Sequence, residues 1–114
     1  MSWHATLDLP HCGECGRSNN IDIGNYTHNT DTMLRTAMAA VGSDFSLYDL
    51  HNKTGHEVHN LLRPALVWWS TNMTELRKLN PENGWGSADG GYEYWNNISE
   101  TCAQNPNGKL WLSG

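Results

Sequence analysis

The sequence predicts an α+β fold in which three main helices pack with a small antiparallel sheet formed by the terminal segments. Three observations support this prediction. Residues 2–9 alternate apolar and polar side chains, residues 109–112 form a second short strand behind a turn signal, and the middle of the chain repeats apolar residues at helical spacing. A chain of 114 residues suffices for one hydrophobic core, so residues 1–114 are expected to form a single domain.

The first strand is predicted from Trp3, Ala5, Leu7 and Leu9, which fall on one side of residues 2–9. At the other end of the chain, residues 109–112 follow Asn-Pro-Asn-Gly, a strong turn signal. We therefore expect the two termini to pair in one sheet.

The segment that follows the first strand has a different composition. Residues 10–29 are rich in Gly, Cys, Asn and Ser, and only Ile21 and Ile23 alternate in the manner of a strand. This composition predicts a knuckle, then a short strand, then a loop.

The first and third helices are predicted from their caps and apolar faces. Asn29 or Thr30 can begin the first helix, which Gly42 ends, and Ser87 or Asp89 can begin the third, which runs through residue 102. The apolar face of the first helix consists of Met33, Leu34, Ala37, Met38 and Val41.

The second helix is the longest one predicted. Thr-Gly-His-Glu at residues 54–57 has the form of a capping box, and apolar residues recur at three and four positions as far as Leu79. Pro64 should kink or split this helix, because proline lacks the backbone N–H and clashes with the preceding turn.

Composition and charge exclude several classes of function. Twelve acidic and seven basic residues give a net charge of −5, which disfavours nucleic acid and anionic lipid as partners. No apolar run is long enough to span a membrane, and the first residues lack the layout of a signal peptide, so a cytoplasmic location is expected. Six Trp and four Tyr against one Phe indicate either a core threaded with hydrogen bonds or a pocket lined with rings.

Cys12 and Cys15 form the sharpest local motif, Cys-x-x-Cys-Gly. Two thiolates at this spacing supply half of a tetrahedral zinc site, so we expect a structural zinc ion with Cys12 and Cys15 as ligands. A solvated turn with two free thiols and a redox pair are the alternatives, and the second is disfavoured because no helix signal follows the motif. The remaining donors are Cys102, His4, His11, His28, His51, His56 and His59.

Two polar segments are candidates for a ligand site. Asn25, Tyr26, Thr27, His28 and Asn29 stand in a row before the first helix, where amide, hydroxyl and imidazole groups can meet a polar or anionic ligand. The alternative is an elaborate helix cap.

The second polar segment is the glycine-rich stretch from Asn80 to Gly86, which contains Asn83 and Trp85 and runs into the third helix. As a phosphate loop it is a weak match, because no Lys-Ser/Thr follows the glycines. Alternatively, its glycines allow Trp85 to fold back over the core.

Catalytic motifs have little support. The chain lacks a Gly-x-Ser-x-Gly elbow, His-Glu-Val-His has the wrong spacing for a zinc protease, and no pair of carboxylates is singled out.

With these motifs in view, the chain resembles a group of small proteins encoded by bacteriophages and bacteria. The resemblance spans nearly the whole chain and implies a small accessory protein that occupies a host component or sequesters a signalling nucleotide. The positions that carry it are Cys12, Cys15, Asn25, Thr27, His28, Asn29, Asn80, Pro81, Asn83, Gly84, Trp85 and Gly86.

From these residues and this resemblance we expect a binding protein that sequesters a small polar or nucleotide-derived signal. Its pocket is predicted to combine the two polar segments, with Asn25, Thr27, His28, Asn29, Asn83 and Trp85 as its binding residues. A module that inhibits a host enzyme, and a small hydrolase acting on a phosphate or glycosidic bond, remain as alternatives.

Overall fold

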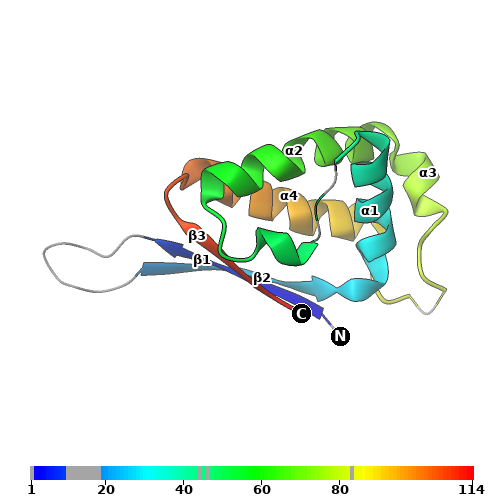
Figure 1. Ribbon diagram of the computed structural model, residues 1–114. Helices are drawn as coiled ribbons and strands as arrows, with labels where there is room; N and C mark the ends of the chain where they lie inside the picture. Colours follow the sequence, from blue (N-terminus) through cyan, green and yellow to red (C-terminus); the bar gives the residue numbers. More distant parts are fainter. Residues whose placement is uncertain (1, 10–18, 44, 46, 83) are drawn as a thin grey trace, which may run out of the picture.

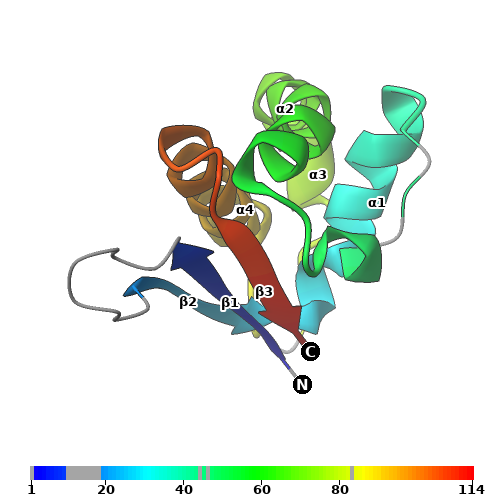
Figure 2. The ribbon, with the colours of Figure 1, turned by 60° about the vertical axis from the view of Figure 1, so that its left-hand side comes forward.

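The computed structural model describes residues 2–9, 19–43, 45, 47–82 and 84–114. These residues form an α+β fold with a three-stranded antiparallel sheet and four α-helices. The elements in chain order are β1 (Ser2–Leu9), β2 (Asn19–Thr27), η1 (His28–Thr30), α1 (Asp31–Ala40), η2 (Leu47–Leu50), α2 (Gly55–Thr71), α3 (Met73–Arg77), α4 (Ala88–Gln104) and β3 (Lys109–Ser113), where η denotes a short 3-10 helix. The four α-helices lie on the same face of the sheet (Figures 1 and 2).

The sheet joins the two ends of the chain, as the sequence predicts. Its strand order is β2-β1-β3, so the N-terminal strand is central and pairs with the C-terminal strand. Leu7 lies opposite Leu110 and Ala5 opposite Leu112, and all four side chains are buried beneath the helices. The period of two in residues 2–9 therefore reflects one buried and one open face.

Strand β2 is longer than expected and contains a bulge. The register with β1 shifts between Ala5 and Thr6, where Ile23 is the extra residue of β2. Gly24 adopts a positive φ of 106° beside it, and its N–H donates to the Asp22 carboxylate at 3.0 Å. Beyond the bulge, pairing continues to Thr27, so residues 25–27 are strand rather than the predicted loop.

Two predicted helix caps are present. The Thr54 hydroxyl accepts a hydrogen bond from the N–H of Glu57 and donates to its carboxylate, at 3.3 and 3.1 Å. Ser87 rather than Asp89 caps α4, and its hydroxyl accepts from the N–H of Gly90 at 3.1 Å. Both helices begin where the short polar side chain satisfies one of the first free amides.

The second predicted helix is split, but not at Pro64. Helix α2 continues through Pro64, whose side chain is exposed, and ends at Thr71, with Asn72 as its C-cap. The amide nitrogen of the Asn72 side chain donates to the carbonyl of Trp68 at 2.9 Å, and the Asn72 backbone N–H donates to the same carbonyl at 3.0 Å. Helix α3 begins at the next residue, Met73. The structure therefore has four α-helices in place of three.

The core contains three fully buried tryptophans, Trp3, Trp69 and Trp95. The indole N–H of Trp3 donates to the Asp31 carboxylate at 2.7 Å, and the Tyr94 hydroxyl donates to the backbone carbonyl of Trp3 at 3.3 Å. The excess of Trp and Tyr over Phe thus produces, in part, a hydrogen-bonded core.

Within the part of the chain that the structure describes, no helix has both the length and the apolar character needed to cross a membrane.

Candidate binding site

A pocket of about 690 Å³ lies where the end of β2 and η1 meet the loop between α3 and α4. Its volume is within the roughly 300–1,000 Å³ typical of small-molecule sites. The residues that line it are Ser2, Asn25, Tyr26, Thr27, Asn29, Trp85 and Gly86.

One wall of the pocket is the turn from β2 into η1. The Thr27 hydroxyl accepts from the N–H of Asn29 at 3.2 Å, and the Thr27 carbonyl accepts from the hydroxyl of Thr30 at 3.4 Å. These bonds hold the backbone at the point where strand becomes helix. The side chains of Asn25 and Asn29 are exposed on either side of this turn.

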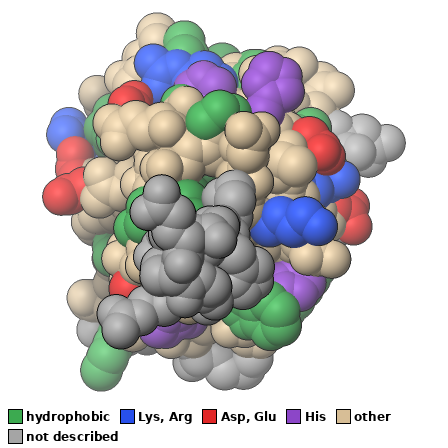
Figure 3. Space-filling model, turned by 90° about the vertical axis from the view of Figure 1, so that its left-hand side faces the viewer, with side chains coloured by type: hydrophobic (Ala, Val, Ile, Leu, Met, Phe, Trp, Pro, Cys, Tyr) green, Lys and Arg blue, Asp and Glu red, His purple; other side chains and the backbone are tan. Residues whose placement is uncertain are grey.

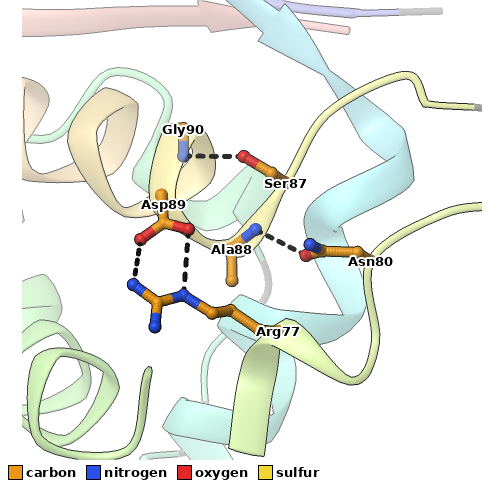
Figure 4. Close-up of polar contacts among 6 residues, drawn as sticks. All are labelled: Arg77, Asn80, Ser87, Ala88, Asp89 and Gly90. Carbon is orange, nitrogen blue, oxygen red and sulfur yellow. Dashed lines mark hydrogen bonds and ion pairs between the residues drawn. The ribbon is translucent and has the colours of Figure 1, made fainter. Parts of the chain in front are cut away.

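The opposite wall is formed by Trp85 and Gly86. They belong to the stretch between α3 and α4, of which residues 80–82 and 84–87 are described and are here called the Trp85 loop. Asn80 in this loop and Arg77 in α3 are both bonded to the start of α4 (Figure 4). The side-chain oxygen of Asn80 accepts from the N–H of Ala88 at 2.8 Å. Arg77 donates two hydrogen bonds to the Asp89 carboxylate, at 2.8 and 3.1 Å. These hydrogen bonds lower the pKa of Asp89, so the pair is ionised at neutral pH.

The Trp85 loop also contacts the first wall directly. The N–H of Ser87 donates to the Tyr26 hydroxyl at 3.1 Å, and the Asn29 side chain donates to the carbonyl of Trp85 at 3.4 Å. Gly86 permits this approach, since a Cβ there would lie 2.6 Å from the Thr27 methyl carbon. The two polar segments therefore form one concave surface.

Trp85 extends from this loop into solvent. Its side chain is 69% exposed while it lines the pocket, so it does not fold back over the core. An aromatic face in this position can stack on a planar ligand.

Three of the amides at the start of α4 are already bonded within the protein. Those of Ser87, Ala88 and Gly90 donate to the Tyr26 hydroxyl, the Asn80 side chain and the Ser87 hydroxyl, respectively. An anion at this helix start would have to displace these acceptors. The structure therefore gives no support to the phosphate-loop interpretation.

Four of the six predicted binding residues meet at the pocket: Asn25, Thr27, Asn29 and Trp85. The structure does not bring His28 there. Its ring packs on Trp3 with centroids 4.5 Å apart, and its Nε2 is buried without a hydrogen-bond partner among the described residues. Asn83 lies outside the described residues.

Sequence reasoning missed three lining residues, Ser2, Tyr26 and Gly86. Tyr26 and Gly86 belong to the two predicted polar segments, so their position beside predicted binding residues could have identified them. No sequence feature identifies Ser2, because it reaches the site only through its pairing with Thr27 across the sheet.

The predicted zinc ligands Cys12 and Cys15 also lie outside the described residues. Among the residues that are described, no group of three or more His, Cys, Asp or Glu side chains is placed to hold a metal ion. Cys102 is fully buried in the core, and burial raises the pKa of its thiol to about 12. A thiol that stays protonated at neutral pH is a poor metal ligand.

A serine and a histidine do come together elsewhere. The Nδ1 atom of His59 lies 2.9 Å from the hydroxyl of Ser99, which links α2 to α4. The Ser99 side chain is fully buried, so no substrate can reach its hydroxyl. This contact holds two helices together and does not constitute a hydrolytic site.

No model of a known protein family matches the chain, and neither a curated protein nor a solved structure shows significant similarity to it.

Proposed function

We propose that this protein is a small binding protein that holds a small polar ligand, with nucleotide-derived compounds as the first candidates. One observation supports this proposal above all. The Trp85 ring and the side chains of Asn25 and Asn29 come from distant parts of the sequence, and they line a single pocket.

Contacts within the protein support the walls of this pocket in the absence of a ligand. Asn80 and the ion pair of Arg77 with Asp89 connect the start of the Trp85 loop and α3 to the start of α4. The Tyr26 hydroxyl on β2 is hydrogen-bonded to the N–H of Ser87 at the end of the loop. A preformed pocket spares the ligand the entropic cost of ordering the loop.

A nucleic-acid function has less support. The net charge is −5, and on the face shown in Figure 3 the Lys and Arg side chains are separated from one another and interspersed with acidic groups. No basic stripe that would follow a phosphate backbone is visible on that face.

The biological role that we propose is sequestration of a host signal, to counter a defence response. This role rests on the resemblance to small phage and bacterial proteins and on the polar chemistry of the pocket. We also propose a structural zinc ion held by Cys12 and Cys15.

The binding function is tested by thermal unfolding of the protein in a nucleotide-rich cell extract. A compound that binds the native state raises the melting temperature by mass action. We expect a rise for the wild type and for Trp111→Ala but none for Trp85→Ala. Trp111 is a matched control, because its side chain is 54% exposed and lies outside this pocket.

The fate of the bound compound separates the alternatives. Sequestration predicts that the compound is recovered unchanged after heat denaturation. A chemically altered product would indicate hydrolysis, and a protein that copurifies in equal amount would indicate an interaction module. An extract that shifts none of the melting temperatures would refute the proposed function.

The zinc proposal has its own test. Protein purified without added metal should contain about one zinc ion per chain by elemental analysis, and Cys12→Ser should lower both zinc content and stability. Far less zinc, with stability unchanged in Cys12→Ser, would refute it.

A further inference from the structure

The residues that line the pocket, within the part of the chain that the structure describes, carry no charged side chain. Its described lining residues are serine, asparagine, tyrosine, threonine, tryptophan and glycine, with no lysine, arginine or histidine among them. Sites that recognise phosphate normally provide a cation or a set of unbonded backbone amides.

Several nearby groups that could serve a phosphate are already bonded. The guanidinium of Arg77 donates two hydrogen bonds to the carboxylate of Asp89. This carboxylate lies in the first turn of α4, so the helix start already holds a negative group. The amides of Ser87, Ala88 and Gly90 have acceptors within the protein. A phosphate placed here would lose its hydration without gaining a positive partner.

From these contacts we infer that the pocket recognises the uncharged planar ring of a nucleobase and leaves any phosphate of the ligand in solvent. The inference rests on the proposed function and specifies the part of the ligand that is bound. A nucleoside is then the minimal ligand, and its phosphates contribute nothing to affinity.

The lining residues match such a ring in shape and in hydrogen bonding. The exposed Trp85 ring offers a flat apolar face, and stacking on it tolerates any base. Asn25 carries both a donor and an acceptor, whereas Asn29 uses its amide nitrogen on the Trp85 carbonyl and can offer its oxygen. Asparagine amides pair well with the edge of a purine, which presents a donor beside an acceptor.

Calorimetry with defined probes tests this inference. Adenosine, guanosine, cytidine and uridine are each compared with their 5′-monophosphates, and ribose 5-phosphate and inorganic phosphate serve as charged probes without a base. We expect at least one nucleoside to bind, with its monophosphate within about threefold in Kd. The Kd should not change between about 50 and 500 mM NaCl, because no charge pair is formed.

Variants link the binding to the pocket. Trp85→Ala should weaken nucleoside binding by about 5- to 150-fold, the range that corresponds to loss of one stacked base. Trp111→Ala should leave binding unchanged. Urea unfolding of both variants verifies that they are folded, since neither side chain is part of the buried core.

The outcomes separate this inference from the function on which it rests. Ribose 5-phosphate or inorganic phosphate binding as tightly as a monophosphate would overturn recognition of the base and leave the binding function intact. The same holds if a compound from the extract binds while all four nucleosides fail. If neither the extract nor any probe binds, both proposals are overturned.

Discussion

Gly86→Ala should destabilise the protein at the contact between the Trp85 loop and β2. A Cβ at this position would lie 2.6 Å from the Thr27 methyl carbon and 2.9 Å from that of Thr30, at a φ of +96°. A side chain at positive φ costs about 1–2 kcal/mol, and overpacking costs about 1–3 kcal/mol. Because Thr30 is fully buried and has little room to move aside, both costs apply, and we expect a loss of about 2–5 kcal/mol, or roughly 8–20 °C in Tm for a chain of this size.

Gly84→Ala is the matched control for this measurement. Gly84 also has a positive φ, 75°, but a Cβ there would meet nothing within 4 Å. Only the backbone cost of about 1–2 kcal/mol applies to it. Urea unfolding at equilibrium gives both values, provided that the m-values agree. Equal losses for the two variants would refute the close approach between Gly86 and the threonine methyl groups.

Three further predictions follow from single contacts. Burial raises the pKa of the Cys102 thiol to about 12, so this thiol should react slowly with thiol reagents until urea is added. The measurement is made in the Cys12→Ser/Cys15→Ser double variant, in which Cys102 is the remaining cysteine. Rapid labelling of the native protein would contradict its burial. Burial raises the pKa of Asp31, so the native state retains that proton at higher pH than the unfolded state, and stability falls as pH rises from the unfolded to the folded pKa. The variant Asp31→Asn keeps an acceptor for the Trp3 indole. Its free energy of unfolding, relative to that of the wild type, should therefore be higher at pH 7 than at pH 4. A relative free energy that does not change with pH would refute the argument. Asn80→Ala removes the acceptor of the Ala88 N–H and should lower the free energy of unfolding in urea by about 1 kcal/mol. Asn80→Asp keeps an acceptor and should lower it little. Equal losses for the two variants would show that this hydrogen bond is unimportant.

Local sequence patterns were sufficient to predict most of the strands and helices of the fold. Residues 2–9 alternate because one face of β1 is buried, and Thr54 and Ser87 start helices because a short polar side chain can accept from a free amide. These causes act within a few residues, so they can be identified in the sequence. The pairing of the two termini followed from the presence of two half-buried strands that each need a partner.

Prediction failed where tertiary contacts decide the outcome. Residues 25–27 are polar and resemble a loop, yet β1 pairs with them after the bulge at Ile23. Pro64 was expected to kink or split its helix, but the helix is not split there, because Pro64 lies on the exposed side of α2, where water can satisfy the carbonyl that lacks its partner. His28 packs on Trp3 because the sheet places that ring beside it, and no sequence spacing reports such a contact.

Within the Trp85 loop, residues with a structural role can be distinguished from the residue that we propose contacts the ligand. Asn80 has a structural role because it closes the loop, and Gly86 has one because it permits contact with β2. The ring of Trp85 differs from both, since 69% of its surface remains in water and folding gains little from its burial. The loop is thus held through Asn80 and Gly86 and presents an indole at the pocket, which is the arrangement that the proposed stacking ligand requires.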